Sequence, residues 1–378
     1  MSPWQSLRNQ MPVCRRLAYF DHAAVAPLPE PARAMIAAWA DDVAWHGDRN
    51  WARWQAALAQ VRRLAAGLLG ADEEEIALVR NTTEGVTLVA EGFPWQVGDN
   101  VVLPAAEFPS NRFPWTNLAS RGVEARLVAS PRGRIGLDDL ARACDARTRI
   151  VAVSWVDYAS GWRSDPSALA ELAHDRGALL FLDAIQGLGV LPLDVKAAGI
   201  DFLAADGHKW LLGPEGAGIF YTRREHLDLL RPVGVGWNSV TPTPDYASME
   251  LDLPTTAARY EGGTYPVATF VGLAESLKLL TQTPVEATAE QLLRVTDVLC
   301  ERLRSAGAEI ISDRTGDRAS GIVAFDLRGQ DPHTIRRRCR DADVILNYRD
   351  GHLRASPHVY SDEDDVDRLV EAIGGVVG

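Results

Sequence analysis

Short apolar segments that alternate with helical segments constrain the fold of this 378-residue chain more than any other feature. A strand built from such a segment is apolar on both faces and must be covered on both. A mostly parallel sheet between two layers of helices meets that need, and it binds ligands at the carboxyl ends of its strands. We therefore expect an α/β fold, with strands at 76–79, 100–104, 149–155, 178–183 and 216–221 and helices at 30–46, 51–69, 84–91 and 165–176.

The pattern changes near Val271, where helical segments are followed by strand segments and a final helix. This order predicts a smaller α+β domain at the C-terminus. The predicted division is an N-terminal arm over 1–20, a large domain over 21–270 and a small domain over 271–378, with a continuous helix near 270–285 at the boundary. The small domain is expected to hold helices at 270–281, 284–306 and 362–373 and strands at 321–327 and 343–348.

Charge and cysteine content disfavour several classes of function. A formal net charge of −12 argues against a nucleic-acid partner. The four cysteines are far apart and form no CxxC pair, so we expect neither a metal site nor a disulfide framework. No apolar segment approaches the roughly 20 residues of a membrane span, and the N-terminus lacks a signal-peptide core. These features predict a cytoplasmic protein without a membrane partner.

Two charged residues suggest a cofactor. Asp183 ends one apolar strand segment, and Lys209 follows another within the sequence AADGHKWLLGPEGAG (204–218). A lysine among apolar residues has a depressed pKa and becomes nucleophilic. Pyridoxal phosphate requires a lysine for its aldehyde and an anion for its pyridinium nitrogen, so the pair fits this cofactor. Taken alone, Asp183 is equally well explained as a cap of the next turn.

Candidate phosphate ligands lie in RNTTEGVTLVAEG (80–92). Asn81, Thr82, Thr83 and Gly85 fall at a predicted strand-to-helix junction, where hydroxyls and free backbone N–H groups favour an anion. The alternative is that Thr82 or Thr83 only caps the helix. The two roles are compatible because a helix N-terminus that binds phosphate is also capped.

Six motifs in a fixed order make the chain similar to a known family. They are NTTEG (81–85), EFPSN (107–111), Asp183 with Gln186, GHKW (207–210), EGGT (261–264) and LRASPHVY (353–360). With these motifs, over nearly its whole length, the chain resembles the class V aminotransferase family of fold type I enzymes. That family includes cysteine desulfurases, isopenicillin N epimerase-like proteins and C–S lyases.

The resemblance implies a pyridoxal 5'-phosphate cofactor and assigns residues to its ring. Lys209 would form the imine to the aldehyde, Asp183 would pair the ring nitrogen, and Gln186 would hydrogen-bond the phenolic oxygen. Phe108 stands where many relatives have a histidine stacked on the ring. A phenyl ring can stack but cannot transfer a proton.

The resemblance also assigns the phosphate. Thr83, with Thr82 and His208, would hold it, while Asp206 is expected to bond to His208 or to backbone. Thr264 matches a residue that reaches the phosphate of the partner subunit. The resemblance therefore implies a homodimer with shared active sites.

For an amino-acid substrate, the resemblance assigns Arg354 to the α-carboxylate, which a guanidinium binds through two hydrogen bonds. The alternative for Arg354 is a surface salt bridge with the acidic residues that follow it. His22 and Ala23 match a segment that lines the substrate entry. For His22, a packing or capping role is an equal alternative.

Two departures from the family pattern bear on the reaction. The loop that carries the nucleophilic cysteine in desulfurases is missing before Arg354, and Cys339 lies in a predicted helix instead. Tyr158 stands where relatives often have an asparagine, and it is a candidate catalytic acid. We expect a C–S lyase that works by β-elimination. An aminotransferase, an amino-acid epimerase and a non-catalytic protein that holds the cofactor are the alternatives.

Overall fold

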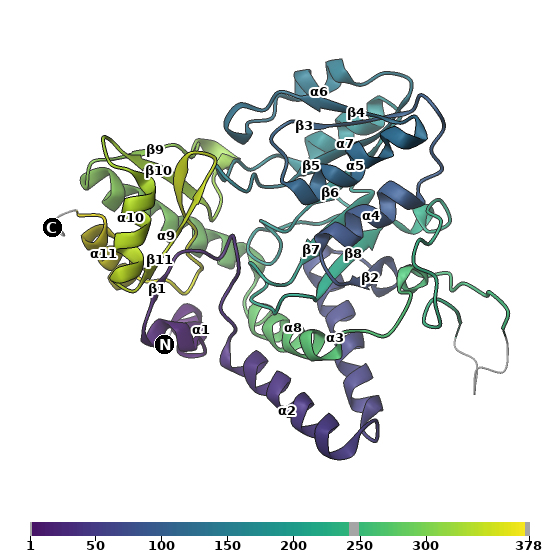
Figure 1. Cartoon of the computed structure of the whole chain (residues 1–378), viewed down its shortest axis with the longest axis horizontal. Helices are drawn as coiled ribbons and strands as arrows, with labels where there is room; N and C mark the ends of the chain where they lie inside the picture. The colour runs from purple at the N-terminus through teal and green to yellow at the C-terminus, as the bar shows by residue number, and fades with distance from the viewer. Residues whose placement is uncertain (1, 242–248, 375–378) are drawn as a thin grey trace.

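The computed structural model describes residues 2–241 and 249–374, and its largest element is a seven-stranded sheet (Figure 1). The strand order is β2-β8-β7-β6-β5-β3-β4. β8 runs antiparallel to both β2 and β7, and the other neighbouring strands pair in parallel, so the sheet is mostly parallel, as expected. The strands are β2 (Ile76–Val79), β3 (Asn100–Pro104), β4 (Glu124–Val128), β5 (Thr148–Ser154), β6 (Leu179–Asp183), β7 (Phe202–Asp206) and β8 (Gly218–Thr222).

Helices cover both faces of this sheet because its strands are apolar on both faces. In β6, Leu180 and Leu182 join one apolar cluster with α3 and α8, whereas Phe181 joins another with α4 and Trp115 of α5. The helices of this part are α2 (Glu30–His46), α3 (Trp51–Leu69), α4 (Thr82–Gly92), α5 (Phe113–Asn117), α6 (Leu137–Ala143), α7 (Pro166–Asp175) and α8 (Val267–Leu280).

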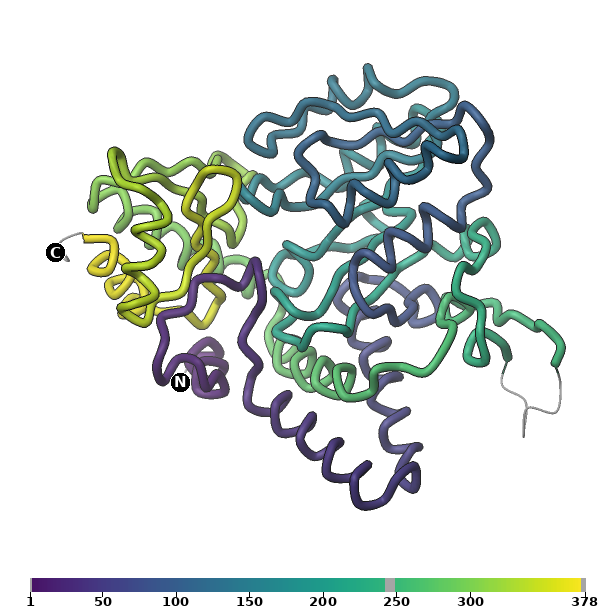
Figure 2. Tube along the Cα trace, viewed as in Figure 1, coloured from purple at the N-terminus to yellow at the C-terminus, as the bar shows by residue number. Residues whose placement is uncertain are grey.

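The C-terminal part forms a smaller α+β layer around a four-stranded antiparallel sheet of order β12-β13-β10-β9. The N-terminal segment joins this layer, because β1 pairs with β11 in parallel; Figure 2 shows the purple N-terminal segment beside the yellow C-terminal layer. The elements are α1 (Pro3–Asn9), β1 (Ala18–Tyr19), α9 (Val285–Ser305), β9 (Ala308–Ile310), β10 (Val323–Leu327), α10 (Pro332–Asp341), β11 (Val344–Ile345), β12 (Asn347–Arg349), β13 (His352–Ala355) and α11 (Glu363–Ala372).

The structure corrects three expectations. The helix expected to run on near 270–285 is two helices, because α8 ends at Leu280 and Pro284 caps the start of α9. The strand expected at 343–348 divides into β11 and β12. The sequence pattern also missed β4, β9 and β13, of which β9 and β13 are short and β4 is only partly buried. The domain boundaries themselves stay a prediction.

Among the described residues, no helix is both long and apolar enough to cross a bilayer.

Candidate active site

The side chains of Lys209 and Asp183 lie at the carboxyl edge of the parallel strands. Asp183 ends β6, and Lys209 follows the end of β7, which pairs with β6 in parallel. Both residues are buried: 7% of the surface of Lys209 and 3% of that of Asp183 are exposed. Burial lowers the pKa of Lys209 to about 8, although the nearby Asp183 carboxylate opposes this change. Burial raises the pKa of Asp183 to about 6, while the Ile185 N–H and the charge of Lys209 oppose the rise.

Two aromatic rings form the wall beside this pair. Lys209 Nζ lies 5.5 Å from the centroid of the Phe108 ring. The Tyr158 ring meets Phe108 edge-on, with centroids 5.2 Å apart. Burial raises the pKa of Tyr158, so its phenol stays protonated at neutral pH. The structure thus brings Phe108, Tyr158 and Lys209 together, although 50 residues separate Phe108 from Tyr158 in the sequence.

Glu107 is a buried acid that the sequence analysis missed. Its Oε1 accepts a 2.7 Å hydrogen bond from Ser154 N, and its Oε2 contacts Ser154 Oγ. Ser154 pairs with Asp183 across β5 and β6. Burial raises the pKa of Glu107 to about 8, and the Asp183 charge adds to the rise. The sequence signal that could have identified Glu107 is its position in the turn after β3, at the same sheet edge.

The N-terminus of α4 is the candidate phosphate site. Asn81 is the cap, because its Oδ1 accepts a 2.9 Å hydrogen bond from Glu84 N. Neither Thr82 nor Thr83 caps the helix, which corrects that alternative. The hydroxyl of Thr82 is buried without a partner, and the Thr83 hydroxyl donates to Ser110 Oγ at 2.8 Å. Both hydroxyls therefore lie where the positive end of a helix favours an anion.

Close packing reinforces this site. A Cβ placed on Gly85 would lie 2.5 Å from the Ala204 Cβ of β7. Only glycine lets the first turn of α4 lie this close to the sheet, so the helix N-terminus stays at the sheet edge.

His208 lies beside the same edge. Its Nδ1 is 2.9 Å from Asp206 Oδ2, as expected, but the contact lacks hydrogen-bond alignment. The second oxygen of Asp206, Oδ1, is buried without a partner. Two buried polar atoms, on Thr82 and Asp206, are thus left unpaired next to the α4 N-terminus.

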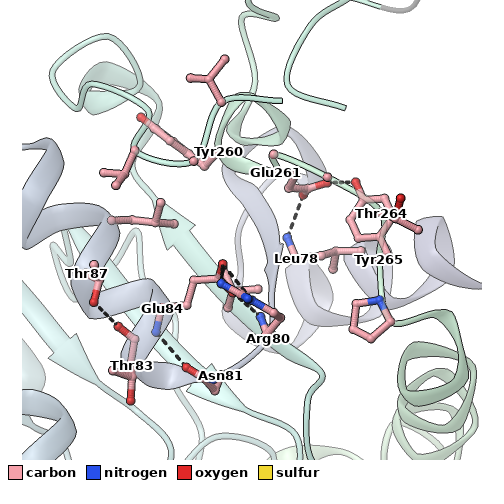
Figure 3. Close-up of a pocket in the computed structure, with 18 of the residues that line it drawn as sticks. Leu78, Arg80, Asn81, Thr83, Glu84, Thr87, Tyr260, Glu261, Thr264 and Tyr265 are labelled. Carbon is pink, nitrogen blue, oxygen red and sulfur yellow. Dashed lines mark hydrogen bonds and ion pairs between the residues drawn. The ribbon is translucent and has the colours of Figure 1, made fainter. Parts of the chain in front are cut away.

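Thr264 lines a surface cavity of about 740 Å³ together with Thr83, Asn81 and Glu84 (Figure 3). Glu261 anchors the loop that carries Thr264, since it accepts hydrogen bonds from Leu78 N and from the side chain of Arg62. Arg80 lies on the cavity wall and pairs with Glu84 at 2.9 Å. The cavity connects the candidate phosphate site with the Thr264 loop.

Gln186 is held by two partners from other elements. Its Oε1 accepts a 2.9 Å hydrogen bond from Trp210 Nε1, and its Nε2 donates to Ala23 O at 3.1 Å. Trp210 stacks on His22, which is fully buried. His22 Nδ1 lies 2.9 Å from Ser356 O, and its Nε2 lies 2.6 Å from the Tyr360 hydroxyl. With both nitrogens engaged, His22 favours the packing alternative, whereas Ala23 touches Gln186 directly.

Arg354 lies in β13 and is almost fully buried. One terminal nitrogen donates to Tyr158 O at 2.6 Å, and the other lies 3.1 Å from Asp21 Oδ1. Its Nε is buried without a partner. The alternative of a surface salt bridge with the acidic residues that follow is wrong, because the ion pair is buried and its partner is Asp21.

These residues fit pyridoxal phosphate. A buried amine with a pKa of about 8 and a buried carboxylate lie near each other. Unpaired polar atoms and a helix N-terminus lie at the same edge. Thr82, Thr83 and His208 can hold the phosphate, and Phe108 can cover one face of the ring. The roles of the individual residues stay predictions.

Comparison with known proteins agrees with this arrangement. The family described as "Aminotransferase class-V" matches residues 18–369. A probable cysteine desulfurase from Methanothermobacter thermautotrophicus is 30% identical over 99% of this chain and 98% of its own length. The apo structure of a cysteine desulfurase from Thermococcus onnurineus NA1 is 25% identical, with a TM-score of 0.87 over 98% of this chain and 97% of that chain.

The structure of a cystine C–S lyase in complex with its product, cysteine persulfide, has the same fold. Its TM-score is 0.89 over 97% of this chain and 100% of that chain, at 23% identity. The described chain therefore has the fold of type I pyridoxal-phosphate enzymes. The chain belongs to the aminotransferase class-V family and is a pyridoxal 5'-phosphate-dependent enzyme.

Proposed function

We propose that this enzyme is a C–S lyase that cleaves a sulfur-substituted amino acid by β-elimination. The likeness to cysteine desulfurases and to a cystine C–S lyase supports a sulfur substrate. The single observation that carries the proposal is the position of the cysteines. All four belong to the described residues, and none lies in the turn that precedes Arg354.

The cysteines are poor candidates for a nucleophile that takes sulfur from a substrate. Cys144, Cys300 and Cys339 are buried, and Cys339 belongs to the apolar core under α10. Burial raises the pKa of Cys339 to about 11 and that of Cys14 to about 11. A thiol with a raised pKa carries little of the reactive thiolate. This supports a reaction that needs no protein-bound persulfide.

The backbone before Arg354 also leaves no room for a mobile loop. Strand β12 ends at Arg349 and β13 begins at His352, so only Asp350 and Gly351 connect them. Both have positive φ angles, 47° and 87°. Two central residues with positive φ are typical of the tight turns that join hairpin strands. This tight turn supports the proposal that the chain lacks the cysteine loop that the family resemblance assigns to desulfurases before the substrate arginine.

The residues divide the chemistry between them. Bound pyridoxal phosphate supplies an electron sink when the Cα–H bond of the substrate breaks. Lys209 Nζ accepts that proton, because its lowered pKa makes the neutral amine accessible near neutral pH. Phe108 has no group that could do so. We assign Asp183, ionised above pH 6, to a protonated ring nitrogen, and Arg354, whose buried Nε has no partner, to the α-carboxylate.

The sulfur group leaves with the electron pair of the Cβ–S bond. Tyr158 is our candidate for the donor of a proton to this leaving thiolate, because its phenol is protonated and lies against Phe108 beside Lys209. The remaining three-carbon product takes up one water and gives pyruvate and ammonia. The bonds formed and broken therefore require no external oxidant or reductant.

The test is to incubate the holoenzyme with S-substituted cysteines and to measure the products. We expect equal amounts of pyruvate and ammonia, together with the free thiol. Mass spectrometry of the protein after incubation with cysteine should show no added sulfur atom. A protein-bound persulfide would indicate a desulfurase instead.

The other outcomes identify the alternatives. Racemised substrate without pyruvate would indicate an epimerase. A keto acid that retains the whole side chain and forms only with an added acceptor would indicate an aminotransferase. If no amino acid changes the absorption spectrum of the bound cofactor, the protein only holds it.

We further propose that the enzyme is a cytoplasmic homodimer in which Thr264 serves the partner's phosphate site. The exposure of Thr264 supports this arrangement, because the residue is open to a partner subunit. Four unpaired cysteines are consistent with a reducing compartment. Sedimentation of the holoenzyme should give twice the chain mass, and Thr264→Ala should weaken cofactor retention. A monomer that retains the cofactor fully would contradict the shared site.

A further inference from the structure

A second arginine, Arg349, lies on the same face of the small sheet as Arg354. In the antiparallel pair β12 and β13, Asn347 is opposite Arg354 and Arg349 is opposite His352. Side chains two residues apart on a strand share a face, so Arg349 and Arg354 are diagonal neighbours. The sequence analysis did not single out Arg349.

A chain of polar contacts joins the two guanidinium groups. Arg349 Nη1 donates to Asn347 Oδ1 at 3.0 Å, and Asn347 Nδ2 donates to Asp21 Oδ2 at 2.7 Å. Asp21 Oδ1 in turn accepts from Arg354 at 3.1 Å. Asn347 thus sets the position of Arg349 with respect to Arg354 and takes up only one of its terminal nitrogens.

Arg349, Arg354 and Lys209 are three positive groups around this chain. Burial lowers the pKa of Lys209 and of Arg354, and the positive charge of Arg349 lowers both further. Asp21 is the carboxylate that pairs with Arg354, whereas in the described part of the chain no carboxylate forms an ion pair with Arg349.

Two more carboxylates lie near. Asp157 is engaged by three hydrogen bonds from Ala159 and Ser160. Asp350 is exposed in the hairpin turn.

Arg349 also belongs to the reaction site. Its charge acts on Lys209 and on Tyr158, in both cases favouring loss of a proton. It is partly exposed, and within the described residues only its Nη1 donates hydrogen bonds, to Asn347 Oδ1 and to Tyr348 O. A cavity of about 230 Å³ lies next to the hairpin turn. Its charged or phenolic lining residues are Tyr158, Arg112, Glu107, Asp157 and Asp350, and Arg349 itself does not line it.

We propose that Arg349 is a specificity residue that binds a second anionic group, at the far end of the substrate side chain. The substrate would then be an S-conjugate of cysteine whose sulfur substituent ends in a carboxylate or another anion. A guanidinium that keeps donors free next to the α-carboxylate site is suited to this role. The inference rests on the proposed function, since it assumes that Arg354 binds the α-carboxylate.

The experiment compares two conjugates of almost equal shape, S-carboxymethyl-cysteine and its neutral amide, S-carbamoylmethyl-cysteine. With the wild-type holoenzyme, we expect kcat/KM for pyruvate formation to be about 10- to 100-fold higher for the acid, the effect of one charged hydrogen bond. Arg349→Gln should remove this preference by raising KM for the acid alone. Arg349→Lys should restore part of it. Arg340→Gln removes the same charge at an exposed position of α10, and it should leave the preference for the acid intact.

Binding is measured separately, from the change that each conjugate causes in the absorption spectrum of the bound cofactor. An equal response to both conjugates in the wild type, or a preference that survives in Arg349→Gln, overturns the proposal for Arg349. If the acid binds preferentially but no pyruvate forms, the anion site holds and the lyase reaction fails. If both conjugates give equal amounts of pyruvate, the lyase reaction holds and the anion site fails.

Discussion

The edge of the large sheet and the hairpin of the small layer hold their charges in opposite ways. At the sheet edge, Lys209 has no carboxylate within ion-pair distance among the described residues, and Asp183 accepts only a backbone N–H. At the hairpin, Arg354 is fixed by Asp21 and by the Tyr158 carbonyl. Unpaired buried charges are costly, and the cofactor can relieve them. We therefore propose the sheet edge as the site of the cofactor and the hairpin as the site that selects the substrate.

The largest effect tests the sheet edge. Lys209→Ala should reduce turnover by roughly 10⁴-fold or more, because it removes both the covalent anchor and the base. It should also abolish the absorption band of the covalently held cofactor. Lys278→Ala, on the exposed side of α8, is the control. If the band survives in Lys209→Ala, the sheet edge is not the cofactor site.

The second test removes the charge of Asp183 and keeps its shape. Asp183→Asn should lower kcat by on the order of 10²- to 10³-fold, because a fixed charge that stabilises the reacting centre is lost. KM should change little, because Arg354 and the hairpin are untouched. Asp175→Asn at the exposed end of α7 serves as the control. A change confined to KM would mean that Asp183 acts in substrate binding, and would contradict the proposed separation of cofactor chemistry at the sheet edge from substrate binding at the hairpin.

The third test measures the cost of the buried amine. The pKa of Lys209 is about 8 in the folded protein against an ordinary value of 10.5. Between these pH values the unfolded chain binds more protons, so this group makes the free energy of unfolding rise with pH across the window. Cofactor-free Lys209→Met should be more stable than the wild type at pH 7, by about 3 kcal/mol. The difference should shrink as the pH approaches 10.5.

Chemical denaturation of both cofactor-free proteins at several pH values provides this measurement. The difference between variant and wild type cancels the other titrating groups. A difference that stays constant with pH would show that burial does not lower the pKa of Lys209. The contrast between an unpaired amine at the sheet edge and a paired arginine at the hairpin would then be weaker.

The smallest effect tests the hairpin. Gly351 has a φ of 87° and open space around its Cα, as does Gly329 with a φ of 74°. Replacing either by alanine should cost about 1 kcal/mol of stability, the strain of a left-handed residue. Only Gly351→Ala should also raise KM, because it shifts the turn that positions Arg349. Equal KM values in both variants would contradict a role of the hairpin in selection.

The sequence alone determined much of the large part of the fold. Strands such as Leu179–Asp183 were predictable because they are apolar on both faces, and α3 was predictable because its buried residues recur at helical spacing. Asp183 and Lys209 were predictable because each follows such a strand, and parallel strands end at one edge. Short strands such as β13 escaped prediction, since few residues carry the pattern.

Only the tertiary structure placed Asp21, Asn347 and Arg349 with Arg354, because contacts between the N-terminal segment and the hairpin leave no periodic trace in the sequence. It also decided that Glu107 is a buried acid beside Asp183 and that both ring nitrogens of His22 have partners, Ser356 O and the Tyr360 hydroxyl. Periodicity reports which face of an element is buried, and it therefore predicted the sheet edge that we propose for the cofactor. The choice of substrate depends on side chains from distant segments, and chain folding alone brings those together.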